Sequence, residues 1–130
     1  MRTLVEDVMS TDVAAVEATT AVETVAQVLD ARKISAVPVV DRDNLVLGVV
    51  SEVDVLRHRF TGRSASDVMS TPAVTIRPDQ PAAVAAQRMD RHGIKRLPVV
   101  DDLGRLVGII SRGDLVRVLA RGDRLQAGGT

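Results

Sequence analysis

Cysteine, tryptophan and tyrosine are absent from this sequence of 130 residues, and phenylalanine occurs once, as Phe60. Without cysteine the chain can form no disulfide, bind no metal through thiolates and use no cysteine nucleophile. With a single aromatic side chain it also lacks the usual stacking platform for bases of single-stranded nucleic acid. Hydrophobic residues still make up 45% of the chain. They predict a core of valine, leucine, isoleucine, alanine and methionine.

Net charge and long apolar runs are also lacking. The formal net charge at pH 7 is zero, so no overall positive field attracts nucleic acid, and we expect no nucleic-acid partner. No hydrophobic run is long enough to span a bilayer, and acidic residues lie where a signal peptide would have its apolar segment. We therefore expect a soluble cytoplasmic protein without membrane insertion.

The charges are nevertheless divided unevenly along the chain. Residues 5–60 carry 5 Arg or Lys and 10 Asp or Glu, a net charge of −5. Residues 65–120 carry 8 and 6, a net charge of +2. This difference indicates either ordinary variation on solvated surfaces or a second half that faces an anion.

An internal duplication appears when the sequence is aligned with itself at an offset of 60 residues. Residues 7–11 match residues 67–71, and residues 38–41 match residues 98–101. In all, 17 of 56 aligned pairs are identical without a gap. We place the first repeat in residues 1–62 and the second in residues 63–122. The polar tail, residues 123–130, is expected to fray.

Each repeat begins with a short apolar run, at residues 13–16 and 74–76, that predicts a strand. In the first repeat Thr20 and Glu23 have the spacing of a capping box that opens a helix. The second repeat opens the same helix with Pro81 in its first turn and ends it at Gly93. The predicted inward stripes of these helices are Val22, Val25, Ala26 and Leu29, and Ala82, Ala85, Ala86 and Met89.

Two further strands and a second helix complete each repeat. Residues 37–40 and 45–50 predict two strands joined by a turn, and Ser51 stands where the second helix begins. Each repeat is therefore β-α-β-β-α, and the fold class is α/β with two such repeats. Because a unit of this size is marginal alone, we expect the repeats to pack together.

A serine and an aspartate recur at the start of the second helix, as Ser51 and Asp54 and again as Ser111 and Asp114. A serine there caps the helix, and an aspartate in the first turn interacts favourably with the helix dipole. Amides left free at a helix start also favour a nearby phosphate. Capping and ligand binding both explain the pair.

The order and spacing of these motifs resemble a tandem pair of cystathionine β-synthase (CBS) domains, often called a Bateman module. The matching stretches are DVMS, then ISAVPVVD and IKRLPVVD, then GVVSEVD and GIISRGD. The resemblance covers residues 4–120 and implies two repeats packed about a pseudo-two-fold axis. The family usually regulates an attached enzyme, channel or transporter. Here we expect a stand-alone module.

The resemblance implies that each aspartate accepts hydrogen bonds from the ribose hydroxyls of an adenine nucleotide. It also implies clefts built from both repeats, with the adenine read by main-chain groups. The favoured cleft would contain Asp114, Ser111, Arg96, Lys95, Arg112, Thr20, Ile34 and Ser35. A second, weaker cleft would contain Asp54, Ser51, Gln80 and Ile94, with Lys95 available to compensate for a missing basic residue.

Arg96 makes the two expected clefts unequal, because the first repeat has Ala36 at that position. In the family a basic residue here commonly meets phosphate, and guanidinium suits phosphate through bidentate hydrogen bonds. The alternative is that Lys95 and Arg96 are surface charges beside Asp101 and Asp102. The second cleft would then hold a nucleoside-like ligand or nothing.

No arrangement in the sequence predicts catalysis. His58 and His92 have no second ligand at metal spacing, and no glycine-rich phosphate loop is present. We expect no catalytic residues, no metal site and no required cofactor. The expected regulatory ligand is an adenine nucleotide such as AMP, ADP or ATP. S-adenosylmethionine, dinucleotides and cyclic dinucleotides remain alternatives.

The sequence is compatible with two functions. In the first, the chain is a sensor that binds an adenine nucleotide between its repeats and signals to an unidentified protein partner. In the second, it is an assembly module whose clefts are vestigial. The resemblance also implies a homodimer through helical faces, where Ala82, Ala83, Ala85 and Ala86 would allow close approach.

Overall fold

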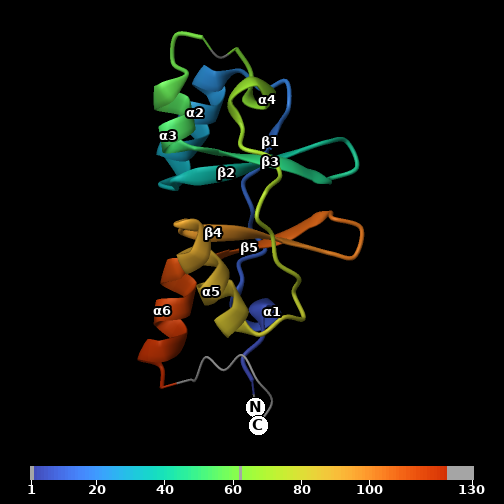
Figure 1. Ribbon diagram of the computed structural model, residues 1–130, viewed down its shortest axis with the longest axis vertical. Coiled ribbons are helices and arrows are strands. Elements are labelled where there is room, and N and C mark those ends of the chain that lie inside the picture. Colours follow the sequence, from blue (N-terminus) through green and yellow to red (C-terminus); the bar gives the residue numbers. More distant parts are fainter. Residues whose placement is uncertain (1, 62, 123–130) are drawn as a thin grey trace. The chain divides into compact units, whose positions relative to one another are not determined.

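The computed structural model describes residues 2–61 and 63–122, which form two compact units (Figure 1). The central unit is Ala14–Ala73, and the terminal unit combines residues 2–13 with residues 74–122. The units therefore do not coincide with the sequence repeats, because each repeat gives its entry segment to the body of the other. The tail at 123–130 lies outside the described residues, so its expected fraying stays a prediction.

The central unit contains the complete β-α-β-β-α pattern. Its elements are β1 (Val16–Glu17), α2 (Val22–Arg32), β2 (Ala36–Val40), β3 (Val46–Ser51), α3 (Glu52–Arg57) and α4 (Ala65–Val68). Strand β2 lies in the middle of the sheet, parallel to β1 and antiparallel to β3. The pattern predicted for the first repeat is confirmed, although its opening strand has only 2 residues.

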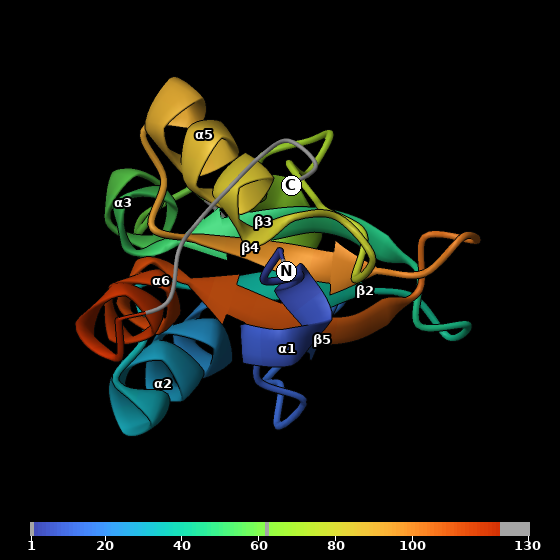
Figure 2. The same ribbon diagram turned by 90° about the horizontal axis from the view of Figure 1, so that it is seen from below.

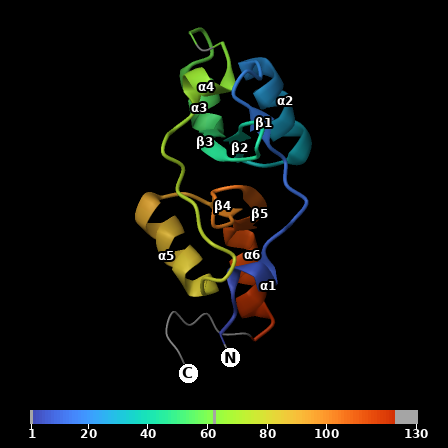
Figure 3. The same ribbon diagram turned by 90° about the vertical axis from the view of Figure 1, so that its right-hand side faces the viewer.

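The terminal unit repeats this arrangement. It contains α1 (Val5–Val8), α5 (Ala82–His92), β4 (Arg96–Val100), β5 (Leu106–Ser111) and α6 (Arg112–Ala120). Strands β4 and β5 form an antiparallel hairpin, and Figure 3 shows α5 and α6 beside it. The predicted strand at 74–76 is reduced to a single parallel bridge between Ile76 and Val99.

The entry segments close the edges of these sheets. In the terminal unit Ser10 exchanges backbone hydrogen bonds with Ile109 at 2.8 and 2.9 Å, and Figure 2 shows this segment and α1 next to the hairpin. Ser70 exchanges the same pair of bonds with Val49 in the central unit. The repeated DVMS motif thus has a structural role, since it pairs with the last strand of a unit.

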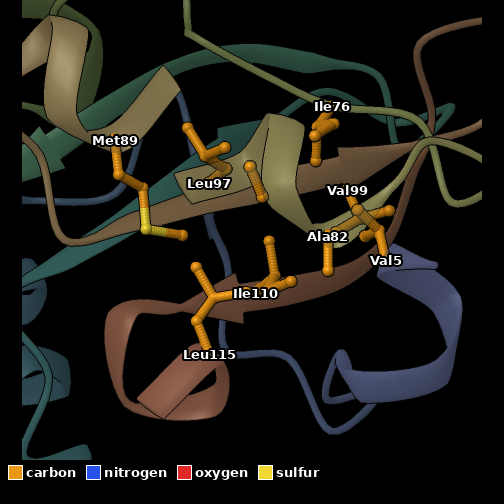
Figure 4. Close-up of a cluster of buried hydrophobic side chains, with 9 residues drawn as sticks. Val5, Ile76, Ala82, Met89, Leu97, Val99, Ile110 and Leu115 are labelled. Atoms are coloured by element: carbon orange, nitrogen blue, oxygen red, sulfur yellow. The ribbon is translucent and has the colours of Figure 1, made fainter. Parts of the chain in front are cut away.

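Each unit has its own aliphatic core. In the terminal unit, side chains from α5, β4, β5 and α6 converge, and Val5 of α1 lies at one side (Figure 4). The nine core residues are Val5, Ile76, Ala82, Ala85, Met89, Leu97, Val99, Ile110 and Leu115. The corresponding residues of the central unit include Val25, Leu29, Val37, Val39 and Val50. The predicted aliphatic core is confirmed.

The predicted start of α2 is wrong. Ala21, not Thr20, is the N-cap, and no side chain caps the helix. Instead the hydroxyl of Thr20 accepts a hydrogen bond from the Glu17 amide at 3.0 Å. The helix start is fixed by main chain, because the Val22 amide donates to the carbonyl of Arg63 in the entry segment.

The predicted start of α5 is shifted by one residue for the same reason. Pro81 is the N-cap rather than part of the first turn, and the Ala82 amide donates to the Thr3 carbonyl at 2.8 Å. Its predicted end is confirmed: Gly93 adopts the left-handed conformation with φ of 63°. Within residues 2–61 and 63–122, no helix has the length and hydrophobicity needed to cross a bilayer.

Candidate functional site

Ser111 and Asp114 form a reciprocal cap at the start of α6. The Ser111 hydroxyl accepts from the Asp114 amide at 3.2 Å, and Asp114 Oδ2 accepts from the Ser111 amide at 2.8 Å. The other oxygen, Oδ1, forms an ion pair with Arg117. The Asp114 side chain is only 12% exposed, so this carboxylate is held in one orientation.

Ser51 and Asp54 form the same cap at the start of α3. Asp54 Oδ2 accepts from the Ser51 amide and the Ser51 hydroxyl, each at 2.9 Å. Among the described residues Asp54 Oδ1 has no hydrogen-bond partner, although Arg57 corresponds to Arg117. The capping prediction is confirmed in both repeats. Since a carboxylate has about four acceptor sites, both aspartates can still accept further hydrogen bonds.

Capping leaves fewer free amides at these helix starts than the sequence suggested. The Arg112 amide donates to the Lys95 carbonyl at 2.7 Å, and the Asp114 amide is taken by Ser111. Within the part of the chain that the structure describes, Gly113 has the one first-turn amide of α6 without an acceptor. A phosphate at α6 would therefore meet a single backbone donor.

Strand register places Arg96 at the start of α6. Arg96 lies opposite Ser111 across the β4–β5 hairpin, whereas Ala36 lies opposite Ser51 across β2–β3. The expected difference between the repeats, an arginine in one and an alanine in the other, thus occurs at structurally equivalent positions. Asp101 accepts from Arg105 at 2.8 Å, and Asp102 pairs with Arg77, so the carboxylates named in the surface-charge alternative have other partners.

Two further residues differ between the helix starts: Arg112, which was predicted for the favoured cleft, and Gly113, which was not. Arg112 and Gly113 stand where the first repeat has Glu52 and Val53. A Cβ on Gly113 would lie 3.7 Å from the Ser111 hydroxyl, which is ordinary contact, so the fold does not require glycine there. The change from valine to glycine is visible when GVVSEVD is compared with GIISRGD, but its connection with an open amide is not.

The remaining predicted site residues have roles inside their own units. In the central unit the Ser35 carbonyl accepts from the Glu52 amide at 2.9 Å, and Ile34 packs against the core. In the terminal unit Gln80 accepts from the Arg77 amide at 3.1 Å, and Ile94 packs against the core. The participation of these residues and Thr20 in ligand binding stays a prediction.

Two surface carboxylates have lowered pKa values, for local reasons. The backbone amide of Arg105 lowers the pKa of Asp101, and that of Ser64 lowers the pKa of Asp67. Neither belongs to the α3 or α6 cap. Among residues 2–61 and 63–122, no group of three or more acidic or histidine side chains is arranged to hold a metal ion.

Two curated relatives differ in how much of their own length this chain covers. The chain is 36% identical over 115 residues to the CBS domain-containing protein YhcV of Bacillus subtilis, covering 85% of this chain and 81% of that protein. It is 34% identical over 113 residues to homoserine O-acetyltransferase of Methanococcoides burtonii, covering 86% of this chain but 23% of that enzyme. The chain thus spans less than a quarter of such enzymes.

Solved structures of the same fold contain adenosyl compounds. CBSX2 in complex with AMP matches with a TM-score of 0.87 and 29% identity, covering 93% of this chain and 98% of that chain. The CBS domain pair of MJ0100, in complex with 5′-methylthioadenosine and S-adenosyl-L-methionine, matches with a TM-score of 0.86 and 25% identity. It covers 95% of this chain and 100% of its own.

These likenesses confirm the predicted α/β fold of paired repeats. The CBS domain model matches residues 5–60 and again residues 65–121, nearly the whole length of the chain. The chain therefore belongs to the CBS domain family and carries two copies of the domain.

Proposed function

We propose that this chain is a regulatory module that binds an adenosyl ligand, with the start of α6 as its main binding end. Structures of the same fold hold AMP in one case and S-adenosyl-L-methionine with 5′-methylthioadenosine in another. Binding of this ligand class is therefore the first activity to test. We propose no catalytic step, and the ligand acts as a regulator rather than as a cofactor.

The observation that carries this proposal is the unlike chemistry of two helix starts that share one cap. The α6 start has Arg96, Arg112 and the open amide of Gly113. The α3 start has Ala36, Glu52 and Val53 at the equivalent positions, and the Val53 amide, for which the described residues likewise show no acceptor, lies beside a branched side chain. Two cations favour a ligand phosphate, whereas an added carboxylate disfavours it. We therefore propose that an adenine nucleotide binds at the start of α6 in preference to the start of α3.

Asp114 has the acceptor capacity that a ribose needs. Its Oδ2 accepts one hydrogen bond from Ser111 and its Oδ1 pairs with Arg117, so each oxygen keeps one lone pair. Two adjacent ribose hydroxyls can donate to these positions without breaking the cap. Because Asp114 is already oriented by Ser111 and Arg117, ligand binding would cost little side-chain entropy.

The direct test is calorimetric titration with AMP, ATP, S-adenosylmethionine and cyclic di-AMP. Asp114→Ala and Asp54→Ala are matched variants, because each removes the same capping interaction. We expect Asp114→Ala to weaken nucleotide binding about ten- to hundredfold, through loss of hydrogen bonds to a charged group. Asp54→Ala should leave that binding intact.

An assembly module without ligand is the second candidate function. It is favoured by the caps themselves, which account for Ser51, Asp54, Ser111 and Asp114 without any nucleotide. On this alternative both Asp→Ala variants lower only the stability of the fold. Absence of heat with every ligand at millimolar concentration would support it and contradict the sensor proposal.

We also propose that the module is a homodimer and that ligand binding is transmitted to a protein partner. Of the alanines expected at the dimer contact, Ala82 and Ala85 are buried in the core of the terminal unit and Ala86 packs against that core, so their side chains offer little surface to a second copy. Helix α6 instead exposes Val116 and Leu119, three positions apart on one face. This α6 face is the contact that we propose between copies.

A further inference from the structure

The guanidinium of Arg117 lies beside the first turn of α6. Its Nη2 atom donates to Asp114 Oδ1, and its Nη1 atom would lie 3.9 Å from a Cβ added to Gly113. The Arg117 side chain is 62% exposed, whereas the Asp114 side chain is 12% exposed. A partly solvated cation therefore lies next to a nearly buried carboxylate, close to the residue with the open amide.

Gly113 leaves room for this guanidinium. The distance of 3.9 Å is ordinary contact for a single added carbon, but a valine carries two further methyl groups on that carbon. The first repeat has Val53 at this position and Arg57 at the position of Arg117. Among the described residues, no ion pair joins Arg57 to Asp54. The glycine is thus found together with the ion pair, and the valine is found where the described residues show none.

The ion pair changes the charge that a ligand would meet at the cap. A carboxylate that accepts hydrogen bonds from ribose hydroxyls also repels a phosphate on the same ribose, and a cation beside the carboxylate opposes this repulsion. At α6 the charge of Asp114 is balanced by Arg117. At α3 the charge of Asp54 is increased by that of Glu52 in the same turn. The two caps therefore differ toward phosphate even without a direct contact from a basic residue.

We propose that Arg117 is a specificity-determining residue, which selects adenosyl ligands by the charge attached to their ribose. The inference rests on the proposed function, because it requires that Asp114 holds the ribose. With Arg117 paired to Asp114, the site accepts ligands that carry an anionic phosphate. Without this pair, the negative charge of Asp114 favours neutral or cationic compounds such as adenosine or S-adenosylmethionine. Arg117 acts through Asp114 and needs no contact with the ligand.

A purely structural role for Arg117 predicts a different result. A pair three positions apart that only stabilises the helix or orients Asp114 would, when removed, weaken AMP and adenosine by the same factor. A pair that selects by charge weakens the anionic ligand and spares the neutral one. The ratio of the two affinities therefore separates these roles.

The test is calorimetric titration of the full chain with adenosine, AMP and S-adenosylmethionine, compared with the same titrations of Arg117→Gln. We expect the affinity for AMP to fall about tenfold, as for loss of a charge near a protein surface, while the affinity for adenosine stays the same. The affinity for S-adenosylmethionine should rise. Arg117→Lys should restore most of the affinity for AMP, because lysine returns the charge. The effect on AMP should shrink at high salt.

Arg57→Gln is the matched control, because Arg57 is the repeat equivalent of Arg117 and the described residues show no ion pair between it and Asp54. It should leave all three affinities unchanged, and a thermal melt of each variant monitors the fold.

Two kinds of outcome would contradict the inference. Equal weakening of AMP and adenosine by Arg117→Gln, or no change in either, would overturn it while the proposed function stands. A wild-type chain that prefers adenosine to AMP would do the same. If the wild-type chain binds none of the three compounds at millimolar concentration, the proposed function fails and the inference fails with it.

Discussion

The sulfur of Met9 occupies the space that a side chain on Gly108 would need. A Cβ added to Gly108 would lie 2.7 Å from this sulfur and 3.0 Å from the Ser10 carbonyl oxygen. In the central unit a Cβ on Gly48 would lie 2.8 Å from the sulfur of Met69. The glycine and the methionine of each sequence motif are therefore explained by one contact, repeated in both units.

Gly108→Ala should destabilise the protein by about 1–3 kcal/mol, the usual cost of overpacking a tight contact. The entry segment would have to move away from β5 to admit the methyl group. Urea unfolding followed by circular dichroism measures the change. Gly113→Ala is the control, because its new methyl meets only atoms at 3.7 Å or beyond. Equal stability of both variants would contradict the proposed tight contact.

Gly113→Val should weaken nucleotide binding while the fold remains intact. The substitution gives α6 the valine that α3 carries at Val53, and places a branched side chain beside the one open amide. We expect at least about a tenfold loss of affinity, corresponding to about 1.4 kcal/mol. Calorimetry measures the affinity and a thermal melt monitors the fold. Unchanged affinity would remove Gly113 and its amide from the site.

Asp114→Ala and Asp54→Ala should lower stability by similar amounts, about 1 kcal/mol each, because both remove the acidic half of a helix cap. Asp114→Ala should cost slightly more, since it also leaves Arg117 without its ion pair. That pair lies partly in solvent and contributes only about 0.2–1 kcal/mol. Urea titration of both variants provides the comparison. A much larger loss for Asp54→Ala would show that the two caps are not equivalent.

Val116→Ser together with Leu119→Ser should shift a dimer toward monomer at low micromolar concentration. Both side chains are exposed on α6, and burying them against a second copy is the expected source of affinity. Sedimentation equilibrium measures the shift. Ala83→Ser, a small change at a buried position, serves as the control and should not alter the association. A wild-type chain that sediments only as monomer would contradict the dimer.

A fragment of residues 14–73 should be more helical than a fragment of residues 1–62. The fragment that ends at residue 73 retains Ala65 and Val68, both buried in the core of the central unit. It also retains the Arg63 carbonyl that accepts from the Val22 amide at 3.3 Å. Far-ultraviolet circular dichroism compares the two fragments at equal concentration. Equal helicity would mean that the entry segment contributes little to this unit.

Most of the local structure could be predicted from the sequence, because it depends on residues close together in the chain. The two hairpins, the serine caps and the end of α5 at Gly93 all follow from short patterns. The starts of α2 and α5 could not be predicted in this way. They are fixed by the carbonyls of Arg63 and Thr3, which come from entry segments of the opposite repeat.

The candidate site was predicted in part. Arg96 was singled out by the departure from the repeat, and strand register places it opposite Ser111. The open amide of Gly113 was missed, because it depends on the acceptors of the neighbouring amides, which the sequence does not show. The amides of Arg112 and Asp114 each donate to an acceptor within the fold, so the Gly113 amide is the one left open in the first turn of α6 among the described residues.

The division of the chain into Ala14–Ala73 and the two flanking segments also sets an order for folding during synthesis. The central unit is continuous, so all of its parts are present once residue 73 has left the ribosome. Residues 2–13 emerge before the central unit, yet their partners in β5 and α6 are made after it. Domains generally fold as units as the chain emerges. Residues 2–13 must therefore wait until β5 and α6 have been synthesised before they reach their place.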